Sequence, residues 1–452
     1  MKIHFIGIGG IGVSALAQYY LQEGHQISGS DLEFSEITDF LQKKGVKIII
    51  GNNAENIQKD FDLVVYSPAV KPENPEFAAA KAFGIKLQSY PEALGELTKE
   101  YFTIAVSGAH GKSTTTAMIG LVLIKAGIDP TVIVGTKLKE FGQDASVSHK
   151  VRTPVSGSNF RMGHSKYLVI EACEYDSSFS HYFPKITVVT NVDKEHLDYF
   201  KTFKNVIKEF KSFILKLPKE GFLVANKDDK NLIKITKGKF STKYYSLKDK
   251  ESAKLKKLLK IPGQHNISNA LAALSVARIL NIKDVVTFKS LSEYKGSWRR
   301  FEIKEGNIGG NHSTQLRARK ITIISDYGHH PTEILVTLKA VREKYQSKKI
   351  WCVFQPHQYQ RTYYLFKDFV KVFRQVKIDN IIITDIYDVA GREEEKINAE
   401  ISSEKLVKKI NKRNINYMPI DKAEEFIKKN IKKGDILIIM GAGDIYKLVD
   451  KF

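Results

Sequence analysis

The stretch that decides the fold is residues 102–113, where the β-rich run Phe102–Val106 leads into the loop Ser107–Ser113, SGAHGKS. The loop keeps the mechanics of the phosphate-binding pattern G-x-x-x-x-G-K-[ST], although Val106 stands in place of its first glycine. In such a loop, backbone N–H groups cradle phosphates, the lysine contacts the outer phosphates and the serine hydroxyl binds Mg²⁺. Because a helix is expected over Ser113–Ala126, the sequence predicts ATP binding here.

Strands and helices alternate on both sides of this loop, in three blocks with boundaries expected at 1–98, 99–295 and 296–452. Alternation of this kind predicts an α/β fold with parallel sheets, and ligands of such sheets bind at the carboxyl ends of the strands. The expected strands are Ile3–Ile6, Gln26–Gly29, Val46–Ile50, Leu63–Tyr66, Phe102–Val106, Thr131–Val134, Tyr167–Ile170, Thr187–Thr190, Ile321–Ser325, Ile350–Phe354, Asn380–Thr384 and Asp435–Met440.

A second glycine loop, GIGGIG, lies between the first strand and the first expected helix. Gly7, Gly9 and Gly12 satisfy G-x-G-x-x-G, and Asp31 lies 19 residues past Gly12. This arrangement predicts a nucleotide diphosphate at the helix N-terminus, with the acid near a ribose hydroxyl. The alternative is that the glycines only permit a tight helix–strand contact. The pattern does not identify the nucleotide, and NAD is its default reading.

Two acidic loops also follow expected strands. Glu171, the first residue of the segment EACEYD, is best placed to offer a carboxylate to the magnesium ion of the phosphate loop. The segment NVDKEH ends at His196, which could serve a second magnesium ion, although a lone histidine is more often structural. Solvated loop acids are the alternative reading for both segments.

Three further polar segments lie later in the chain. In PGQHNISNA, residues 262–270, asparagine side chains could bind an adenine edge, but helix capping by Asn266 is the simpler reading. The segments DYGHHPTE and FQPHQYQRT each follow a strand. His329 and His330 are adjacent, so their side chains diverge and a zinc site is disfavoured. A polar pocket in which Arg361 binds a carboxylate is preferred.

Composition limits the class of protein. The chain has 452 residues, 42% of them hydrophobic, and a formal net charge of +21. Two cysteines exclude a disulfide framework and a four-ligand zinc site, and no apolar run reaches the roughly 18 residues of a membrane helix. The basic residues are mostly lysines spread along the chain, which favours a solvated surface that attracts anionic substrates over a nucleic-acid interface. We expect a cytoplasmic protein without a nucleic-acid partner or membrane insertion.

Together with WRRFE and MGAGDI, these segments resemble the Mur ligases over nearly the whole chain, and FQPHQYQRT distinguishes it from the murein tripeptide ligases. The resemblance implies an N-terminal Rossmann-like domain for a UDP-sugar, a central P-loop ATPase-like domain and a C-terminal Rossmann-like domain. There are departures. Ala109 and Ser113 replace the usual threonines, Cys173 replaces an aspartate, and Gly306–Arg319 is longer and more basic than the usual link.

The resemblance implies an ATP-dependent ligase of peptidoglycan precursor synthesis. It would join L-alanine to the lactyl carboxylate of UDP-N-acetylmuramate through an acyl phosphate, releasing ADP and phosphate. Two Mg²⁺ ions are expected. Glycine or L-serine could replace alanine, because one small group contributes only about 1–3 kcal/mol of discrimination. Oligomeric state and regulation are not indicated.

The resemblance also assigns residues. The UDP-sugar would contact Gly9, Gly10, Ile11, Gly12, Asp31 and Ser67. ATP would contact Gly108, His110, Gly111, Lys112, Ser113, Thr114, Asn266, Asn269, Arg300 and Asp326, with Asn269 as the preferred base contact. Metal ions would bind Ser113, Glu171 and His196, and the alanine pocket would contain Tyr327, His329, His357 and Arg361. The residues expected to act in catalysis are Lys112, His196, Arg361 and His329, the last near the attacking amine.

Two other classes remain as alternatives. The first alternative is an NAD-dependent oxidoreductase, in which the first glycine loop binds NAD. This alternative leaves the phosphate loop unexplained. A nucleic-acid-dependent ATPase would use the positive charge, and its activity would depend strongly on salt.

Overall fold

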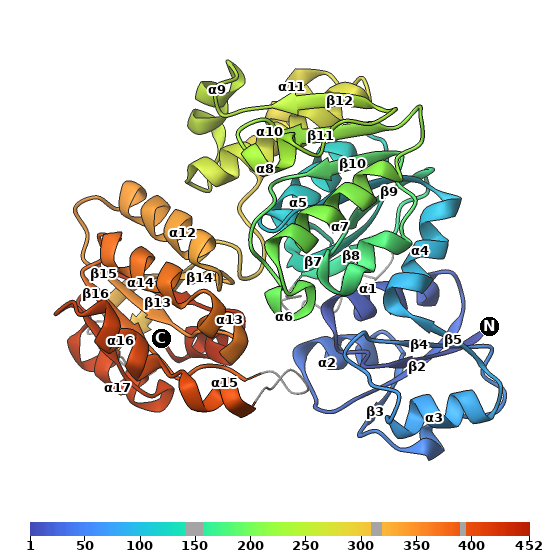
Figure 1. The fold of residues 1–452 in the computed structure, drawn as a ribbon, viewed down its shortest axis with the longest axis horizontal. Helices are drawn as coiled ribbons and strands as arrows, with labels where there is room; N and C mark the ends of the chain where they lie inside the picture. Colours follow the sequence, from blue (N-terminus) through green and yellow to red (C-terminus); the bar gives the residue numbers. More distant parts are fainter. Residues whose placement is uncertain (142–156, 309–318, 389–394) are drawn as a thin grey trace. The chain divides into compact units, whose positions relative to one another are not determined.

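The computed structural model describes residues 1–141, 157–308, 319–388 and 395–452. The chain forms three α/β domains in succession, each built on one sheet (Figure 1). It divides into two compact units, and the N-terminal and central sheets belong to the first of them. The first unit comprises 1–193, 204–252 and 268–291, and the second comprises 194–203, 253–267 and 292–452.

The N-terminal sheet has five parallel strands in the order β3-β2-β1-β4-β5. Every residue of β1 after Lys2 is buried, as expected for the central strand of a sheet covered on both faces. The order reverses between β1 and β4, so the loops that follow these two strands meet at one edge of the sheet. The elements are β1 (Lys2–Ile6), α1 (Ile11–Gln22), β2 (Gln26–Asp31), α2 (Glu36–Lys43), β3 (Lys47–Ile50), η1 (Ala54–Asn56), β4 (Leu63–Tyr66), α3 (Pro75–Ala82), β5 (Lys86–Ser89) and α4 (Tyr90–Glu100).

Among the described residues, the central sheet has seven strands in the order β12-β11-β10-β6-β9-β7-β8, of which only β8 runs antiparallel to its neighbour. The middle strand, β6, leads into the phosphate loop, and its two neighbours carry the acidic loops. The elements are β6 (Phe102–Ser107), α5 (Lys112–Lys125), β7 (Thr131–Leu138), η2 (Lys139–Phe141), β8 (Ser158–Arg161), β9 (Tyr167–Glu171), η3 (Tyr175–His181), β10 (Ile186–Val189), α6 (Leu197–Phe200), α7 (Phe203–Leu215), β11 (Phe222–Asn226), α8 (Lys230–Ile233), β12 (Ser241–Tyr245), α9 (Glu251–Leu258), α10 (Gln264–Ile279) and α11 (Asp284–Glu293).

The C-terminal sheet has six strands in the order β13-β14-β18-β15-β16-β17, with β13 antiparallel at one edge. Its two faces are packed by separate clusters of Ile, Val, Leu and Phe side chains. The elements are β13 (Glu302–Ile308), β14 (Arg319–Asp326), α12 (Pro331–Lys344), β15 (Ile350–Phe354), α13 (Tyr359–Tyr364), α14 (Phe366–Gln375), β16 (Asn380–Ile383), α15 (Glu395–Glu400), α16 (Ser403–Ile410), β17 (Ile415–Tyr417), α17 (Ile420–Asn430), β18 (Ile436–Met440) and η5 (Asp444–Lys451).

The predicted fold class, three α/β domains with mainly parallel sheets, is confirmed. The structure adds the strands β5, β8, β11, β12, β13 and β17, which the sequence reading did not identify. Two of them, β8 and β13, are antiparallel edge strands, which the strand–helix alternation could not predict. Most of the basic segment Gly306–Arg319 lies outside the described residues.

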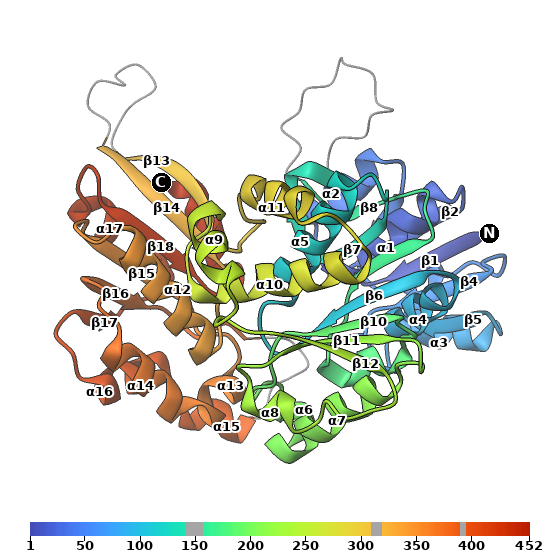
Figure 2. The ribbon, with the colours of Figure 1, turned by 90° about the horizontal axis from the view of Figure 1, so that it is seen from above.

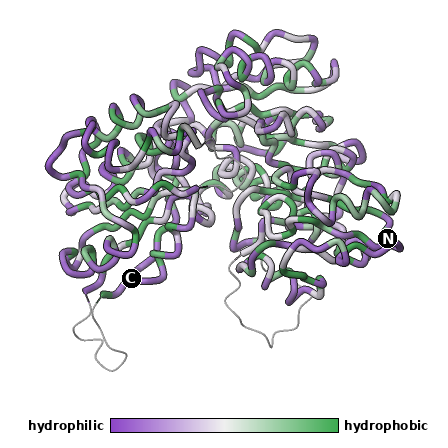
Figure 3. The backbone as a smooth tube through the Cα atoms, turned by 60° about the horizontal axis from the view of Figure 1, so that its bottom comes forward, coloured by the Kyte–Doolittle hydropathy of each residue, from purple (hydrophilic) through white to green (hydrophobic). Residues whose placement is uncertain are grey.

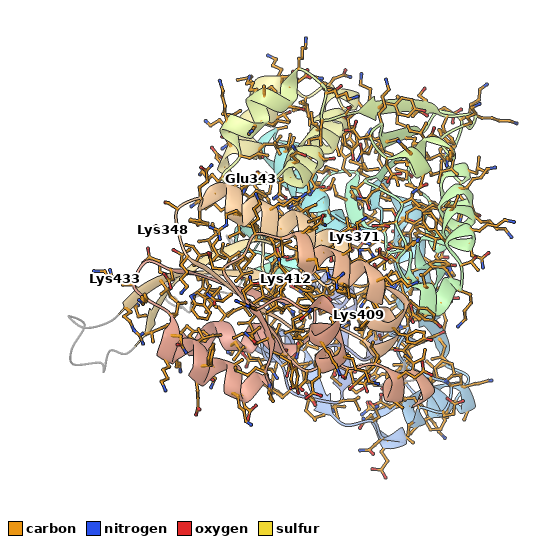
Figure 4. The ribbon with its side chains drawn as sticks, turned by 60° about the vertical axis from the view of Figure 1, so that its left-hand side comes forward. Glu343, Lys348, Lys371, Lys409, Lys412 and Lys433 are labelled. Atoms are coloured by element: carbon orange, nitrogen blue, oxygen red, sulfur yellow. The ribbon has the colours of Figure 1, made fainter. Side chains whose placement is uncertain are left out.

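The distribution of polarity agrees with the expected solvated lysine surface. Figure 3 shows hydrophobic stretches of chain mainly in the interior and hydrophilic stretches mainly at the periphery, which agrees with the burial of the apolar side chains. Figure 4 labels Lys348, Lys371, Lys409 and Lys433, which are exposed on several different elements of the C-terminal domain. Among the described residues, no helix is long and apolar enough to cross a membrane.

Candidate active site

The first glycine loop connects β1 to α1 and lies against residues at the ends of neighbouring strands. Gly7 has a φ of +78°, and the Gly9 N–H donates to Asp31 Oδ2 over 2.7 Å. A Cβ added at Gly9 would lie 2.8 Å from that oxygen, and one added at Gly7 would lie 3.0 Å from Ser67 Cβ. The structure therefore brings the loop, Asp31 and Ser67 together. The N-cap residue Gly10 has no capping side chain, so the start of α1 presents bare backbone.

The phosphate loop connects β6 to α5, and positive φ angles together with closely packed neighbouring side chains explain its glycines. Gly108 has a φ of +132°, and a Cβ there would lie 2.0 Å from Thr190 Oγ1. Gly111, at φ +85°, is the N-cap of α5, and a Cβ there would lie 2.5 Å from Asn269 Oδ1. Asn269, the predicted base contact, thus lies directly beside the loop.

The Lys112 ammonium is held inside this loop. Its Nζ donates to Gly108 O over 2.6 Å and to Ala109 O over 3.2 Å, and it lies 2.9 Å from Glu174 Oε2. Burial on its own would lower the pKa of Lys112, but the buried Glu174 carboxylate outweighs burial and raises that pKa above its usual value. Lys112 is therefore a fixed positive charge at the point where a loop of this kind receives phosphate oxygens.

Ser113 and Glu171 form a pair of oxygen ligands at the same edge of the sheet. Ser113 Oγ donates to Glu171 Oε1 over 3.1 Å, and the Gly135 N–H donates to Glu171 Oε2 over 2.8 Å. A hydroxyl and a carboxylate are the hard oxygen donors that Mg²⁺ prefers, so these residues fit a magnesium ion. The neighbouring Cys173 does not add a ligand of this type, because burial raises the pKa of its thiol to about 12.

His110 is fixed by the loop that follows β10. Its Nε2 lies 3.0 Å from Asp193 Oδ2, its N–H donates to Asn191 Oδ1 over 2.9 Å, and its carbonyl accepts from Thr190 Oγ1 over 2.6 Å. The sequence reading placed His110 at the nucleotide but did not assign these partners. Their position directly after a strand next to β6 could have identified them.

In the second unit, Glu195 is the centre of a charged cluster. Its Oε1 accepts from Arg361 Nη2 over 2.9 Å and from Arg361 Nε over 3.2 Å. His329 Nε2 lies 3.7 Å from Oε1, and His330 Nε2 lies 3.5 Å from Oε2. Although burial opposes ionisation, Arg361 and the histidines hold the pKa of Glu195 well below its usual value. The sequence reading missed Glu195, although it lies next to the predicted metal ligand His196.

The residues predicted for the amino-acid pocket lie around this cluster. Arg361 Nη1 donates to His357 O over 3.1 Å. The Tyr327 ring meets the His329 ring edge-on at 5.3 Å, and the Arg300 guanidinium lies 4.6 Å from the Tyr327 ring centre. These predicted residues therefore gather at the carboxyl ends of β14 and β15.

Two residues predicted at the nucleotide have structural partners. Asn266 lies at the third position of α10 and its Nδ2 donates to Pro262 O over 2.7 Å, so this bond is not the N-cap bond that the simpler reading predicted, in which the side chain accepts from a backbone N–H. The buried Asp326 carboxylate accepts from the N–H groups of Phe301 and Gly328, each over 2.9 Å. Burial raises the pKa of Asp326 to about 6. Neither contact tests the predicted nucleotide role.

Comparison with known proteins gives consistent matches along the chain. Models of the Mur ligase family match residues 2–102 (catalytic domain), 106–277 (middle domain) and 300–443 (glutamate ligase domain). The chain is 41% identical to the UDP-N-acetylmuramate–L-alanine ligase of Acetivibrio thermocellus, with 100% of the chain and 95% of that protein covered. It is 40% identical to the ligase of the same name from Clostridium botulinum, with 100% and 97% covered.

Solved structures agree with this match. The UDP-N-acetylmuramate–alanine ligase MurC of Thermotoga maritima has a TM-score of 0.77 and 25% identity, with 100% of the chain and 98% of that protein covered. The MurF ligase of Thermotoga maritima in complex with ADP has a TM-score of 0.57 and 16% identity, with 94% of each chain covered, and shows likeness of fold alone.

Proposed function

The chain belongs to the Mur ligase family, and on this premise we propose that it joins L-alanine to the lactyl carboxylate of UDP-N-acetylmuramate at the expense of ATP. The full-length identity of about 40% to ligases named for this reaction is the observation that carries the proposal. The product would be a precursor of peptidoglycan, made in the cytoplasm.

The reaction needs activation because a carboxylate has a poor leaving group. Its oxygen attacks the γ-phosphorus of ATP, the bond to the β-phosphate oxygen breaks, and ADP leaves an acyl phosphate behind. The neutral amine of L-alanine then attacks the acyl carbon. The tetrahedral intermediate expels inorganic phosphate, and the amine gives up a proton as the amide forms.

Residues of the first unit support the phosphoryl transfer. We assign Lys112 to the outer phosphates, because its charge is fixed within the loop by Gly108 O and Glu174. Ser113 and Glu171 would hold a magnesium ion, which when bound supplies positive charge against the phosphate oxygens. Asn269 would contact the base beside Gly111. Gly9, Asp31 and Ser67 would bind the UDP-sugar at the other loop.

Residues of the second unit support the amine step. Arg361 has the charge and the planar donor group to bind the carboxylate of alanine. His329, beside Tyr327 and Glu195, is the proposed acceptor of the amine proton. His196 is the proposed ligand of a second magnesium ion.

Product analysis tests the proposal. The purified protein is incubated with ATP, Mg²⁺, UDP-N-acetylmuramate and either L-alanine, glycine or L-serine, and the sugar nucleotide is analysed by mass spectrometry. We expect a mass gain equal to one alanine residue, formed in a 1:1 ratio with ADP. Faster product formation with glycine or serine would correct the amino acid. Absence of any amide product from the folded, ATP-binding protein would reject the ligase assignment.

A further inference from the structure

A buried polar network joins helix α1 to strand β8, within the first unit. Figures 1 and 2 both show the two elements side by side. Gln18 Nε2 donates to Asn159 Oδ1 over 2.9 Å, and Asn159 Nδ2 donates to Ser14 Oγ over 2.9 Å and to Ile11 O. Ser158 Oγ donates to Gln18 Oε1 over 3.1 Å. The network thus connects the N-terminal domain to the central domain.

Both amide groups of the network have their hydrogen-bonding capacity filled. Gln18 also donates to Ser14 O over 3.2 Å, so both amides use their oxygen and their NH₂ group. Gln18 is 1% exposed and Asn159 is 5% exposed. An apolar contact would tolerate sliding of the helix across the strand. A buried and satisfied polar network permits only the arrangement in which every bond forms, because an unpaired buried amide is costly.

The network joins elements that lead to the two ligand loops. On one side, α1 begins directly after the glycine loop assigned to the UDP-sugar. On the other, β8 pairs with β7, whose Gly135 N–H donates to the magnesium carboxylate Glu171.

A separate contact joins the same two domains. Lys137 Nζ, on β7, lies 2.9 Å from Glu36 Oε2, in the first turn of α2. The Lys137 side chain is only 6% exposed. Both contacts lead from the N-terminal domain to β7 and β8, so this pair of strands is one point of attachment between the domains, beside the contact of α4 with η3.

We propose that Gln18 and Asn159 are positioning residues, which set the distance and angle between the sugar-nucleotide loop and the ATP site. The carboxylate that is phosphorylated is carried by one domain and the γ-phosphate by the other, so this attachment aligns the reacting atoms. The expected effect on the reaction rate rests on the proposed function. A displacement of about 1 Å between reacting groups can slow a reaction about 100-fold without weakening the binding of either ligand.

The test compares Asn159→Leu and Gln18→Met, which keep the volume and remove the hydrogen bonds, with Gln22→Met. Gln22 is exposed on the same helix and serves as the matched control. We expect kcat to fall about 100-fold in the two network variants, while calorimetric Kd values for ATP and for UDP-N-acetylmuramate, each measured alone, change less than about threefold. The control should match the wild type.

Two results would overturn the proposal: a kcat within twofold of the wild type, or a loss of activity that is accounted for by weaker binding of one ligand. If the leucine variant does not fold, Ser158→Ala removes the hydroxyl bond to Gln18 and the bond that the hydroxyl accepts from the Phe160 N–H, and its kcat should still fall several-fold with both Kd values unchanged.

Failure of the proposed function can be told apart from failure of the positioning proposal. If the proposed function is wrong, the wild-type protein itself makes no amide product. Hydrogen exchange would still test the attachment in that case. Amides of α1 should exchange faster in Gln18→Met than in Gln22→Met, and equal rates would reject the attachment.

Discussion

The phosphate loop and the Glu195 cluster both hold buried charges, but they hold them by different means. In the loop, Lys112 is fixed by carbonyls of its own turn, Gly108 and Ala109, and by the Glu174 carboxylate, which lies 62 residues away. In the cluster, Glu195 is fixed by Arg361, which lies 166 residues away in the chain. The backbone geometry of the phosphate loop is encoded locally by its glycines and its lysine. The pairing of Glu195 with Arg361 depends on how distant segments of the chain fold together.

The largest effect that separates the two regions is expected at Lys112. Lys112→Ala removes the charge that faces the outer phosphates, and kcat should fall at least 10²–10³-fold. Stability should also fall, because the buried Glu174 carboxylate loses its counterion. The measurement is phosphate release under saturating substrates. Lys125→Ala, at the exposed end of the same helix, is the control and should retain full activity. Retained turnover in Lys112→Ala would show that the loop does not act on phosphate.

Loss of the Glu195 charge is expected to affect stability as well as activity. Glu195→Gln leaves the Arg361 guanidinium buried without its counterion, and breaking such a pair costs about 3–5 kcal/mol. The melting temperature should fall by several degrees, and KM for alanine should rise while Kd for ATP stays constant. The control Asp39→Asn breaks the exposed pair with Lys43 and should cost less than about 1 kcal/mol. An unchanged melting temperature in Glu195→Gln would contradict the buried-pair account.

The sequence predicted the first region far better than the second. Gly108, Gly111, Lys112, Ser113 and Glu171 form a local pattern at strand ends, and the structure brings them together. The sequence predicts no role for Glu195 beyond its place in the segment NVDKEH, because no local pattern reveals that its partner is Arg361, 166 residues away.

The same distinction holds for the fold. Most of the parallel strands with continuous apolar runs were predicted, although the parallel strand β11 was not, and β8 and β13 were missed as well. The sequences of β8 and β13 are short or polar, so they carry little strand signal of their own. Each forms a strand because it pairs antiparallel with the edge of a sheet that other segments build. The alternative of an NAD enzyme is answered by the same long-range evidence, because family membership along the whole chain accounts for both glycine loops.

The pH dependence of stability should sharpen the comparison within the second unit, where two buried carboxylates shift in opposite directions. The pKa of Glu195 is lowered, so its stabilising contribution is present above its unfolded pKa of 4.5 and is lost as the pH falls through its lower folded value. The pKa of Asp326 is raised from 3.8 to about 6, so stability tied to its protonation is present below pH 3.8 and is lost as the pH rises through about 6.

Melting temperatures measured between pH 3.5 and 7 test these signs. Asp326→Asn should remove the decline between about pH 4 and 6, and Glu195→Gln should remove part of the loss in acid. If the melting temperatures of the variants change with pH in the same way as that of the wild type, the assignment of these pKa shifts is contradicted.

The smallest effect is expected at Cys173, where the family usually has an aspartate. Burial keeps this thiol protonated at neutral pH, so it contributes neither charge nor a ligand to magnesium. Cys173→Ser should change kcat and the half-saturating Mg²⁺ concentration less than about twofold. A tenfold increase in the Mg²⁺ requirement would show instead that the thiol contributes to the metal site.

Phosphate release in omission experiments tests the central claim most directly. The protein is given ATP, Mg²⁺ and UDP-N-acetylmuramate, with and without L-alanine, and then ATP, Mg²⁺ and L-alanine without the sugar nucleotide. The ligase account predicts sustained release only in the complete mixture, with one phosphate formed for each amide. Equal release in the absence of the sugar nucleotide, or release stimulated by DNA or RNA instead, would contradict it.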